Sequence, residues 1–143
     1  MMIGNILRNK PQGIVSIAPD MAVLAVSALM AEKNIGAVLV LDQGRLVGIL
    51  SERDVVRSLA SHGAATLTMT AADLMTPDPT TAAPETTVEQ AMAVMTERHF
   101  RHLPVMDNGT LAGVVSIGDV VKARIDQSQY EVETLRTYVG GRV

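Results

Sequence analysis

The chain has 143 residues, of which 48% are hydrophobic and 19% charged, as is typical of folded globular proteins rather than disordered ones. Its net charge of −3 argues against general nucleic-acid binding, which needs a basic face. The lack of Cys excludes disulfides, thiolate catalysis and Cys-ligated metal sites. We expect a cytoplasmic protein without a signal peptide or membrane span, because no apolar run approaches the ~20 residues that a bilayer requires.

The first elements are short. Ile3, Ile6 and Leu7 have helical spacing, which predicts an amphipathic turn over residues 1–9 that packs on a neighbour. Pro and Gly make residues 10–13 a loop.

The next segment predicts a strand, a helix, two strands and a second helix. Val23, Val26 and Met30 give the first helix one apolar face. Ser51 is placed to cap the second helix, because its hydroxyl can accept a hydrogen bond from a free backbone N–H. The predicted elements are a strand at 14–17, a helix from 19 to about 35, strands at 37–41 and 46–50 joined by a turn at 42–45, and a helix at 52–60.

Residues 61–70 are small and polar with one Gly, which predicts a flexible joint. Residues 71–75 form a single helical turn. The same order of elements then returns, with a strand at 80–82, a helix at 88–98, strands at 102–106 and 111–115 around a turn at 107–109, and a helix from Ser116.

The last helix is the longest and can continue to Gly140–Gly141, where Gly ends it. One side of it carries a mixed set of residues that could contact a partner subunit or pack on the same chain: Val120, Ala123, Gln127, Tyr130 and Thr134.

The chain is a tandem duplication. Residues 44–56 and 109–121 each read as a turn, an apolar strand and Ser-x-x-Asp opening a helix. The repeat offset is 65 residues, and it holds without a gap from Ser16/Thr81 to Arg57/Lys122. Internal repeats of this kind decide the fold class: an α/β (α+β) protein of two β-α-β-β-α units.

This ordered set resembles the cystathionine-β-synthase (CBS) domain, which in tandem forms a Bateman module. The resemblance implies two repeats packed in pseudo-twofold symmetry, with sheets flanked by helices. We assign residues 1–70 to the first repeat with the N-terminal segment, 71–126 to the second, and 127–143 to a C-terminal helical tail.

By the same resemblance, two clefts between the repeats hold adenosine-containing ligands such as AMP, ATP or NAD. Asp54 and Asp119 would bind ribose hydroxyls, and Ser51 and Ser116 would face phosphate. The other expected nucleotide-binding residues are Ser16, Ile17, Ala18, Arg53, Thr81, Ala82, Ala83, Arg101, His102, Leu103 and Pro104.

The residue types fit this chemistry. A carboxylate accepts two hydrogen bonds from a cis-diol, a helix N-terminus favours anions, and Arg presents a planar fork to phosphate oxygens. The repeats differ, because the second has Arg101 where the first has Gly36, and the first has Arg53 where the second has Gly118. We expect different affinities, with phosphate in the first cleft relying on Arg53 or on a basic residue such as Lys10.

Structural roles remain open for each of these residues. The serines can be helix caps only, an Asp in a first helical turn is favoured by the helix dipole alone, and Arg101 can pair with a surface carboxylate. His99 and His102 lie three positions apart, but no third ligand accompanies them, so a metal site is not favoured.

Three functions remain. The leading one is a non-catalytic nucleotide sensor of energy or redox state, without a catalytic cofactor. The alternatives are a ligand-free interaction or dimerisation module and an unrecognised small enzyme, although no nucleophile with a sequence-linked base is evident. The resemblance implies a homodimer. The ligand, the occupancy of each cleft, the dimer arrangement and the protein partner cannot be read from the sequence.

Overall fold

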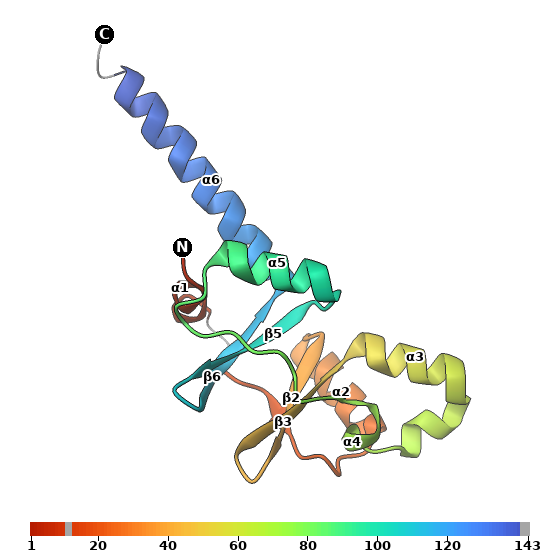
Figure 1. Ribbon diagram of the computed structural model, residues 1–143. Coiled ribbons are helices and arrows are strands. Elements are labelled where there is room, and N and C mark those ends of the chain that lie inside the picture. Colours follow the sequence, from red (N-terminus) through yellow and green to blue (C-terminus); the bar gives the residue numbers. More distant parts are fainter. Residues whose placement is uncertain (11–12, 141–143) are drawn as a thin grey trace. The chain divides into compact units, whose positions relative to one another are not determined.

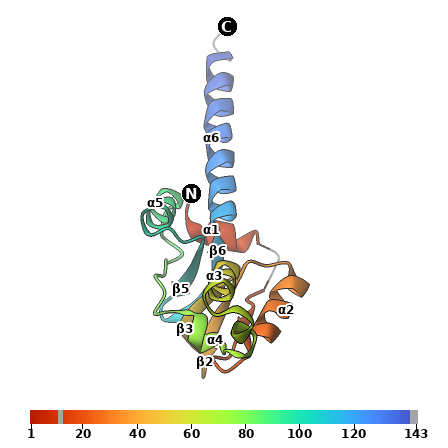
Figure 2. The same ribbon diagram turned by 90° about the vertical axis from the view of Figure 1, so that its right-hand side faces the viewer.

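The computed structural model describes residues 1–10 and 13–140, and Figures 1 and 2 show it in two views. The predicted loop at Pro11 and Gln12 and the predicted helix stop at Gly141 lie outside these residues. The chain forms two compact units, one of Gly13–Thr80 and one of Met1–Gln12 together with Thr81–Val143. Both mix helices with sheet, so the α/β class is confirmed.

The first of these units is a four-stranded sheet with helices. The strand order is β1-β2-β3-β4. β1 runs parallel to β2, whereas β2 with β3 and β3 with β4 are antiparallel. Its elements are β1 (Ser16–Ile17), α2 (Val23–Lys33), β2 (Ala37–Asp42), β3 (Arg45–Ser51), α3 (Glu52–His62), the 3-10 helix η1 (Gly63–Thr68), α4 (Ala71–Leu74) and β4 (Thr76–Pro77).

The second unit repeats the central part of this arrangement. β5 and β6 form an antiparallel pair, and Ala82 makes an isolated parallel bridge to Val105 where β1 stands in the other unit. Its elements are α1 (Ile3–Arg8), α5 (Val88–Arg98), β5 (His102–Asp107), β6 (Thr110–Ser116) and α6 (Ile117–Gly140).

Each unit has its own aliphatic core, which fits a chain that has two Tyr, one Phe and no Trp. Val23, Val26 and Met30 are at most 6% exposed, so the predicted apolar face of α2 is confirmed. The matching face of α5 buries Val88 and Met95. Burial of such side chains contributes roughly 1.5–3 kcal/mol each, so these faces contribute substantially to the stability of each unit.

The two predicted hairpin turns are confirmed. Gln43 and Gly44 have φ of 50° and 80°, and Asn108 and Gly109 have φ of 50° and 82°. Positive φ at both central residues defines a type I′ turn, which matches the twist of paired strands. Each turn therefore fixes the register of its own hairpin.

The N-terminal segments of the repeats are exchanged between the units. Met2 bridges to Thr87, and Ile3 N donates to Thr86 O at 2.8 Å. In the other unit, Thr70 bridges to Ala22 in the same way. The sequence boundaries at 70 and 71 placed both segments with their own repeats; in space α1 joins the second repeat and α4 with β4 joins the first.

The exchange has an apolar cause. Ile3 is fully buried with Val88, Val105 and Val115, and Ala71 is fully buried in the other core. The expected packing of residues 1–9 on a neighbour is thus confirmed, and that neighbour is the second repeat.

The predicted flexible joint at 61–70 was wrong. α3 continues to His62 and is followed by η1. A buried polar contact fixes this segment, because Ser58 Oγ lies 2.8 Å from Thr66 Oγ1 and both residues are buried. Hydrogen bonding of a small polar side chain, which the composition does not reveal, orders the connection.

Candidate functional site

Ser51 and Asp54 form a capping box at the start of α3. Asp54 Oδ2 accepts hydrogen bonds from Ser51 N at 2.8 Å and Ser51 Oγ at 3.0 Å, and Ser51 Oγ accepts one from Asp54 N at 3.3 Å. These bonds satisfy donors that a helix start leaves free. Within the described part of the chain, no hydrogen bond reaches Asp54 Oδ1, so this oxygen remains available as an acceptor.

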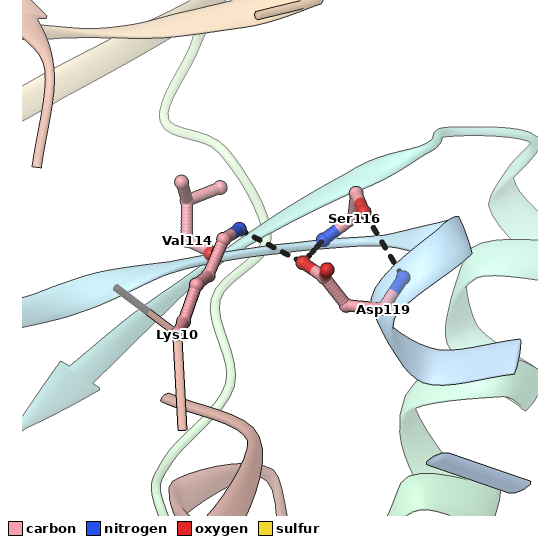
Figure 3. A network of polar contacts seen from close by, with 4 residues as sticks. All are labelled: Lys10, Val114, Ser116 and Asp119. Carbon is pink, nitrogen blue, oxygen red and sulfur yellow. Dashed lines mark hydrogen bonds and ion pairs between the residues drawn. The ribbon is translucent and has the colours of Figure 1, made fainter. Parts of the chain in front are cut away.

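Ser116 and Asp119 make the equivalent bonds at the start of α6. Asp119 Oδ2 accepts from Ser116 N at 2.9 Å, and Ser116 Oγ accepts from Asp119 N at 3.1 Å. Here a cation joins the box: Lys10 Nζ lies 2.8 Å from Asp119 Oδ2 and 3.0 Å from Val114 O. Figure 3 shows Lys10 reaching over β6 to the carboxylate.

This surrounding changes the acidity of Asp119. Burial, the largest influence, raises the pKa of the carboxyl, but hydrogen bonds from Lys10 and Ser116 and the charge of Lys10 together outweigh it. The pKa of Asp119 is therefore below its ordinary value. The side chains of Lys10 and Asp119 are only 26% and 27% exposed, so the pair is partly shielded from water and the carboxylate stays ionised at neutral pH.

The ammonium of Lys10 has one N–H donor that makes no hydrogen bond with the described residues. An ammonium has three N–H donors, and two of them are accounted for by Asp119 and Val114. Asp119 Oδ1 accepts no hydrogen bond from the residues that the structure describes. The site therefore places a free acceptor and a cation next to each other, the pair of groups that a ribose hydroxyl and a phosphate require.

The sequence suggested Arg53, or a basic residue such as Lys10, as the cation for phosphate in the first cleft. The exchange of N-terminal segments brings Lys10 to Asp119 of the second repeat instead. No sequence signal could have located it, since local patterns do not show which repeat the segment joins.

The strand register brings the predicted residues Arg101 and His102 beside Ser116. His102 pairs with Ser116, and Ile117 N donates to Arg101 O at 2.7 Å. In the other unit, Glu52 N donates to Gly36 O at 2.9 Å, so a glycine stands where Arg101 does. Arg101 is exposed and forms no ion pair with any described carboxylate, so the alternative of a surface salt bridge finds no partner here.

Several predicted residues belong to the cores. Leu103 is 1%, Ile17 7% and Ala82 9% exposed, and Pro104 is also buried. Ala82 N donates to Pro104 O at 2.8 Å. Their side chains pack inside the units, so any contribution to a ligand would come from backbone groups.

The remaining predicted residues are more open. Ser16, Ala18 and Thr81 are exposed, whereas Ala83 and Arg53 are half-buried. The parallel pairing of Ser16 with Leu39 places β1 beside β2, whose first residue, Ala37, pairs with Ser51. β1 is thus one strand away from the capping box of its unit.

A separate hollow of about 460 Å³ lies in the unit of Gly13–Thr80, between α2 and α3. It is lined by Ser27, Met30, Ala31, Asn34, Ile35, Gly36, Glu52, Val55 and Val56. None of the predicted nucleotide-binding residues lines it, so it is distinct from the capping box at Asp54.

Two negative findings concern the described residues. No helix there combines the length and apolarity needed to cross a membrane. Among residues 1–10 and 13–140, no three His, Cys, Asp or Glu side chains come together as a metal site would need.

Comparison with protein families gives one match, repeated. The family model described as "CBS domain" matches residues 4–61 and again 71–126. Among curated proteins, the "CBS domain-containing protein CBSX3, mitochondrial" of Arabidopsis thaliana is 37% identical over 117 residues. That match covers 78% of this chain but only 57% of the relative, so the chain spans little more than half of it.

Two solved structures have the same fold. The CBS-domain protein ATU1752 from Agrobacterium tumefaciens is 39% identical with a TM-score of 0.84, covering 87% of this chain and 99% of that one. CBSX2 from Arabidopsis thaliana, solved in complex with AMP, is 26% identical with a TM-score of 0.73, covering 87% and 97%.

Proposed function

This chain belongs to the CBS-domain family, as a tandem pair, and we propose that it is a regulatory module that binds an adenosine-containing nucleotide, AMP, ATP or NAD, and reports energy or redox state. The observation that carries the proposal is the pairing of Lys10 with Asp119, which provides an acceptor and a cation at one helix start. The AMP complex of CBSX2 supports the choice of an adenine nucleotide.

In this site, Asp119 would accept hydrogen bonds from the ribose hydroxyls through Oδ1. Lys10 and Arg101 would face phosphate, together with the Ser116 hydroxyl and the start of α6. Charge-assisted hydrogen bonds are about twice as strong as neutral ones, so these contacts would select a charged nucleotide over its nucleoside.

The Asp54 site would bind differently. It has the carboxylate but no lysine, because Asp54 Oδ2 is bonded only within the box with Ser51. Arg53 is the cation nearest in sequence to it. We propose that the Asp119 site takes a phosphorylated ligand more tightly than the Asp54 site.

We further propose that the chain performs no catalysis and uses no catalytic cofactor. It would pass its ligand state to a second copy in a homodimer and to a protein partner. We propose the cytoplasm as its location, since a Cys-free chain fits a reducing compartment.

A panel of ligands tests the proposal. A ligand that binds only the folded state raises the melting temperature by mass action. Protein stripped of bound nucleotide is heated with AMP, ADP, ATP, NAD and GMP, and the account expects a rise with at least one adenine ligand and a smaller one with GMP. No rise with any adenine ligand would contradict it.

A second function, a ligand-free interaction module, has one observation in its favour. Both Asp side chains complete capping boxes, and this structural role alone explains why Ser-x-x-Asp occurs in each repeat. Under that function, Asp119→Asn would change the melting temperature of the free protein. No nucleotide would raise the melting temperature of either the variant or the wild type.

A further inference from the structure

Only the first part of the last helix, α6, packs against the core of its unit. Val120 and Ala123 are 0% and 7% exposed, whereas all side chains from 129 to 139 are exposed. Figures 1 and 2 show this C-terminal part of α6 without another element of its own unit beside it. Isolated helical segments of this length are marginal in water, so a covering surface would stabilise it.

The exposed apolar residues of this helix follow a regular pattern. We define the α6 seam as Val121, Ile125, Ser128, Val132, Leu135 and Val139, which are separated by alternating steps of four and three. Its apolar members are 38%, 51%, 49%, 64% and 58% exposed in chain order. Alternating steps of four and three give a repeat of 3.5 residues, which is the spacing of a coiled coil rather than of a core-facing helix.

The seam does not coincide with the buried face of α6. At about 100° per residue, it lies roughly a quarter-turn from Val120. The mixed side expected from the sequence runs instead through Val120 and Ala123, which are buried, to Tyr130, which is 71% exposed. The seam is therefore free while the helix stays packed on its unit.

The residues in and beside the α6 seam indicate how many helices pair and in which orientation. Ile125, Val132 and Val139 occupy the a positions, and Leu135 occupies a d position, as do Val121 and Ser128. β-branched residues at a with Leu at d favour two strands over three or four. Glu131 and Arg136 then occupy g and e. In a parallel in-register pair, g of one helix faces the following e of the other, so opposite charges meet twice.

We propose that a second copy of this chain covers the α6 seam, in a parallel, in-register coiled coil over residues 125–139. This names the contact surface of the proposed homodimer and rests on that part of the proposed function, but not on nucleotide binding. Two heptads are short for independent pairing, so the coiled coil adds to whatever other surface the copies share.

The first test compares two double variants with the same added charge. Val132→Glu with Leu135→Glu places four like charges in the seam of the dimer, whereas Thr134→Glu with Thr137→Glu places them on exposed positions outside it. Sedimentation analysis of the full chain is expected to show a dimer dissociation constant raised at least about tenfold for the first pair and unchanged for the second. Circular dichroism checks that both remain folded.

A cross-link tests the orientation. The chain has no Cys, so Val139→Cys introduces a single thiol. In a parallel pair the two thiols meet at one a layer, and added diamide oxidises them to a disulfide. In an antiparallel pair centred on Val132 they lie about 20 Å apart. Thr137→Cys, on the outer face, serves as the control and is expected to cross-link far less.

Each outcome has one meaning. If the seam variant keeps the wild-type dissociation constant, the coiled coil is wrong while the dimer stands. If wild type is a monomer at every concentration, both the dimer and the coiled coil are wrong. A dimer in which Val139→Cys cross-links no better than Thr137→Cys contradicts the parallel arrangement.

Discussion

Leu7, near the end of α1, packs directly on Gly113 in β6: a Cβ atom added to Gly113 would lie 2.9 Å from Leu7 Cδ2. The same device occurs in the other unit, where Met75 covers Gly48 of β3. A glycine at this position of each repeat lets the exchanged N-terminal segment approach the sheet closely. At Gly113 this close approach seats α1, which ends two residues before Lys10.

The two glycines differ in what they would meet. A Cβ on Gly48 would lie 2.9 Å from Met75 Cγ and 3.0 Å from the backbone oxygen of Thr76, whereas one on Gly113 meets only the tip of Leu7. We expect Gly48→Ala to lower the free energy of unfolding by about 1–3 kcal/mol and Gly113→Ala by less than about 1 kcal/mol. Urea unfolding measures both, and the reverse order would contradict this packing.

The capping boxes give a second prediction. Ser51→Ala and Ser116→Ala each remove an acceptor for the N–H of the following Asp, and loss of such a cap costs about 1 kcal/mol. Ser61→Ala, at an exposed position of α3, is the control and should stay within about 0.5 kcal/mol of wild type. Thermal or urea unfolding that shows no difference among the three would argue against structural caps.

Acid should unfold the protein partly through Asp119. Burial raises its folded-state pKa, but Lys10 and Ser116 together outweigh burial, so this pKa is lowered. The stabilisation is therefore complete above the pKa of the unfolded chain, about 4. It is lost as pH falls through the folded-state pKa. In Lys10→Met the lowering is smaller, so the free energy of unfolding should fall less steeply below about pH 4. Equal slopes for variant and wild type would contradict the pairing.

We also expect Lys10 to make the affinity for a nucleotide higher than the affinity for its nucleoside. Lys10→Met keeps much of the aliphatic stem but removes the cation, so AMP affinity should fall about tenfold while adenosine affinity changes little. Lys122→Met, at an exposed position of α6, is the matched control. Titration calorimetry gives both affinities, and a variant that loses AMP and adenosine equally would assign Lys10 to structure alone.

Local chemistry made much of the fold predictable. Type I′ turns at Gln43–Gly44 and Asn108–Gly109, the capping role of Ser51 and the apolar face around Val23 all depend on residues close in sequence. The duplication then extended each prediction to the other repeat.

Non-local contacts set the limit of the prediction. The exchange of α1 and α4 depends on which repeat's sheet each short helix packs against. The formation of η1 depends on the contact between Ser58 and Thr66. The strand at 102–106 could be predicted, but burial of Leu103 in the core could not be told from cleft lining. The contact of Lys10 with Asp119 could not be anticipated for the same reason.

The most direct test of the account is a calorimetric titration of nucleotide-free protein with AMP, comparing wild type with Asp54→Asn, Asp119→Asn and the double variant. Asn keeps an acceptor for the cap but loses the charge and the second acceptor oxygen. Asp119→Asn is expected to weaken the tighter of the two AMP-binding events at least about tenfold. Asp54→Asn is expected to leave the affinity of that event unchanged, and the double variant is expected not to bind AMP. Wild-type affinity retained in folded Asp119→Asn protein would contradict the account.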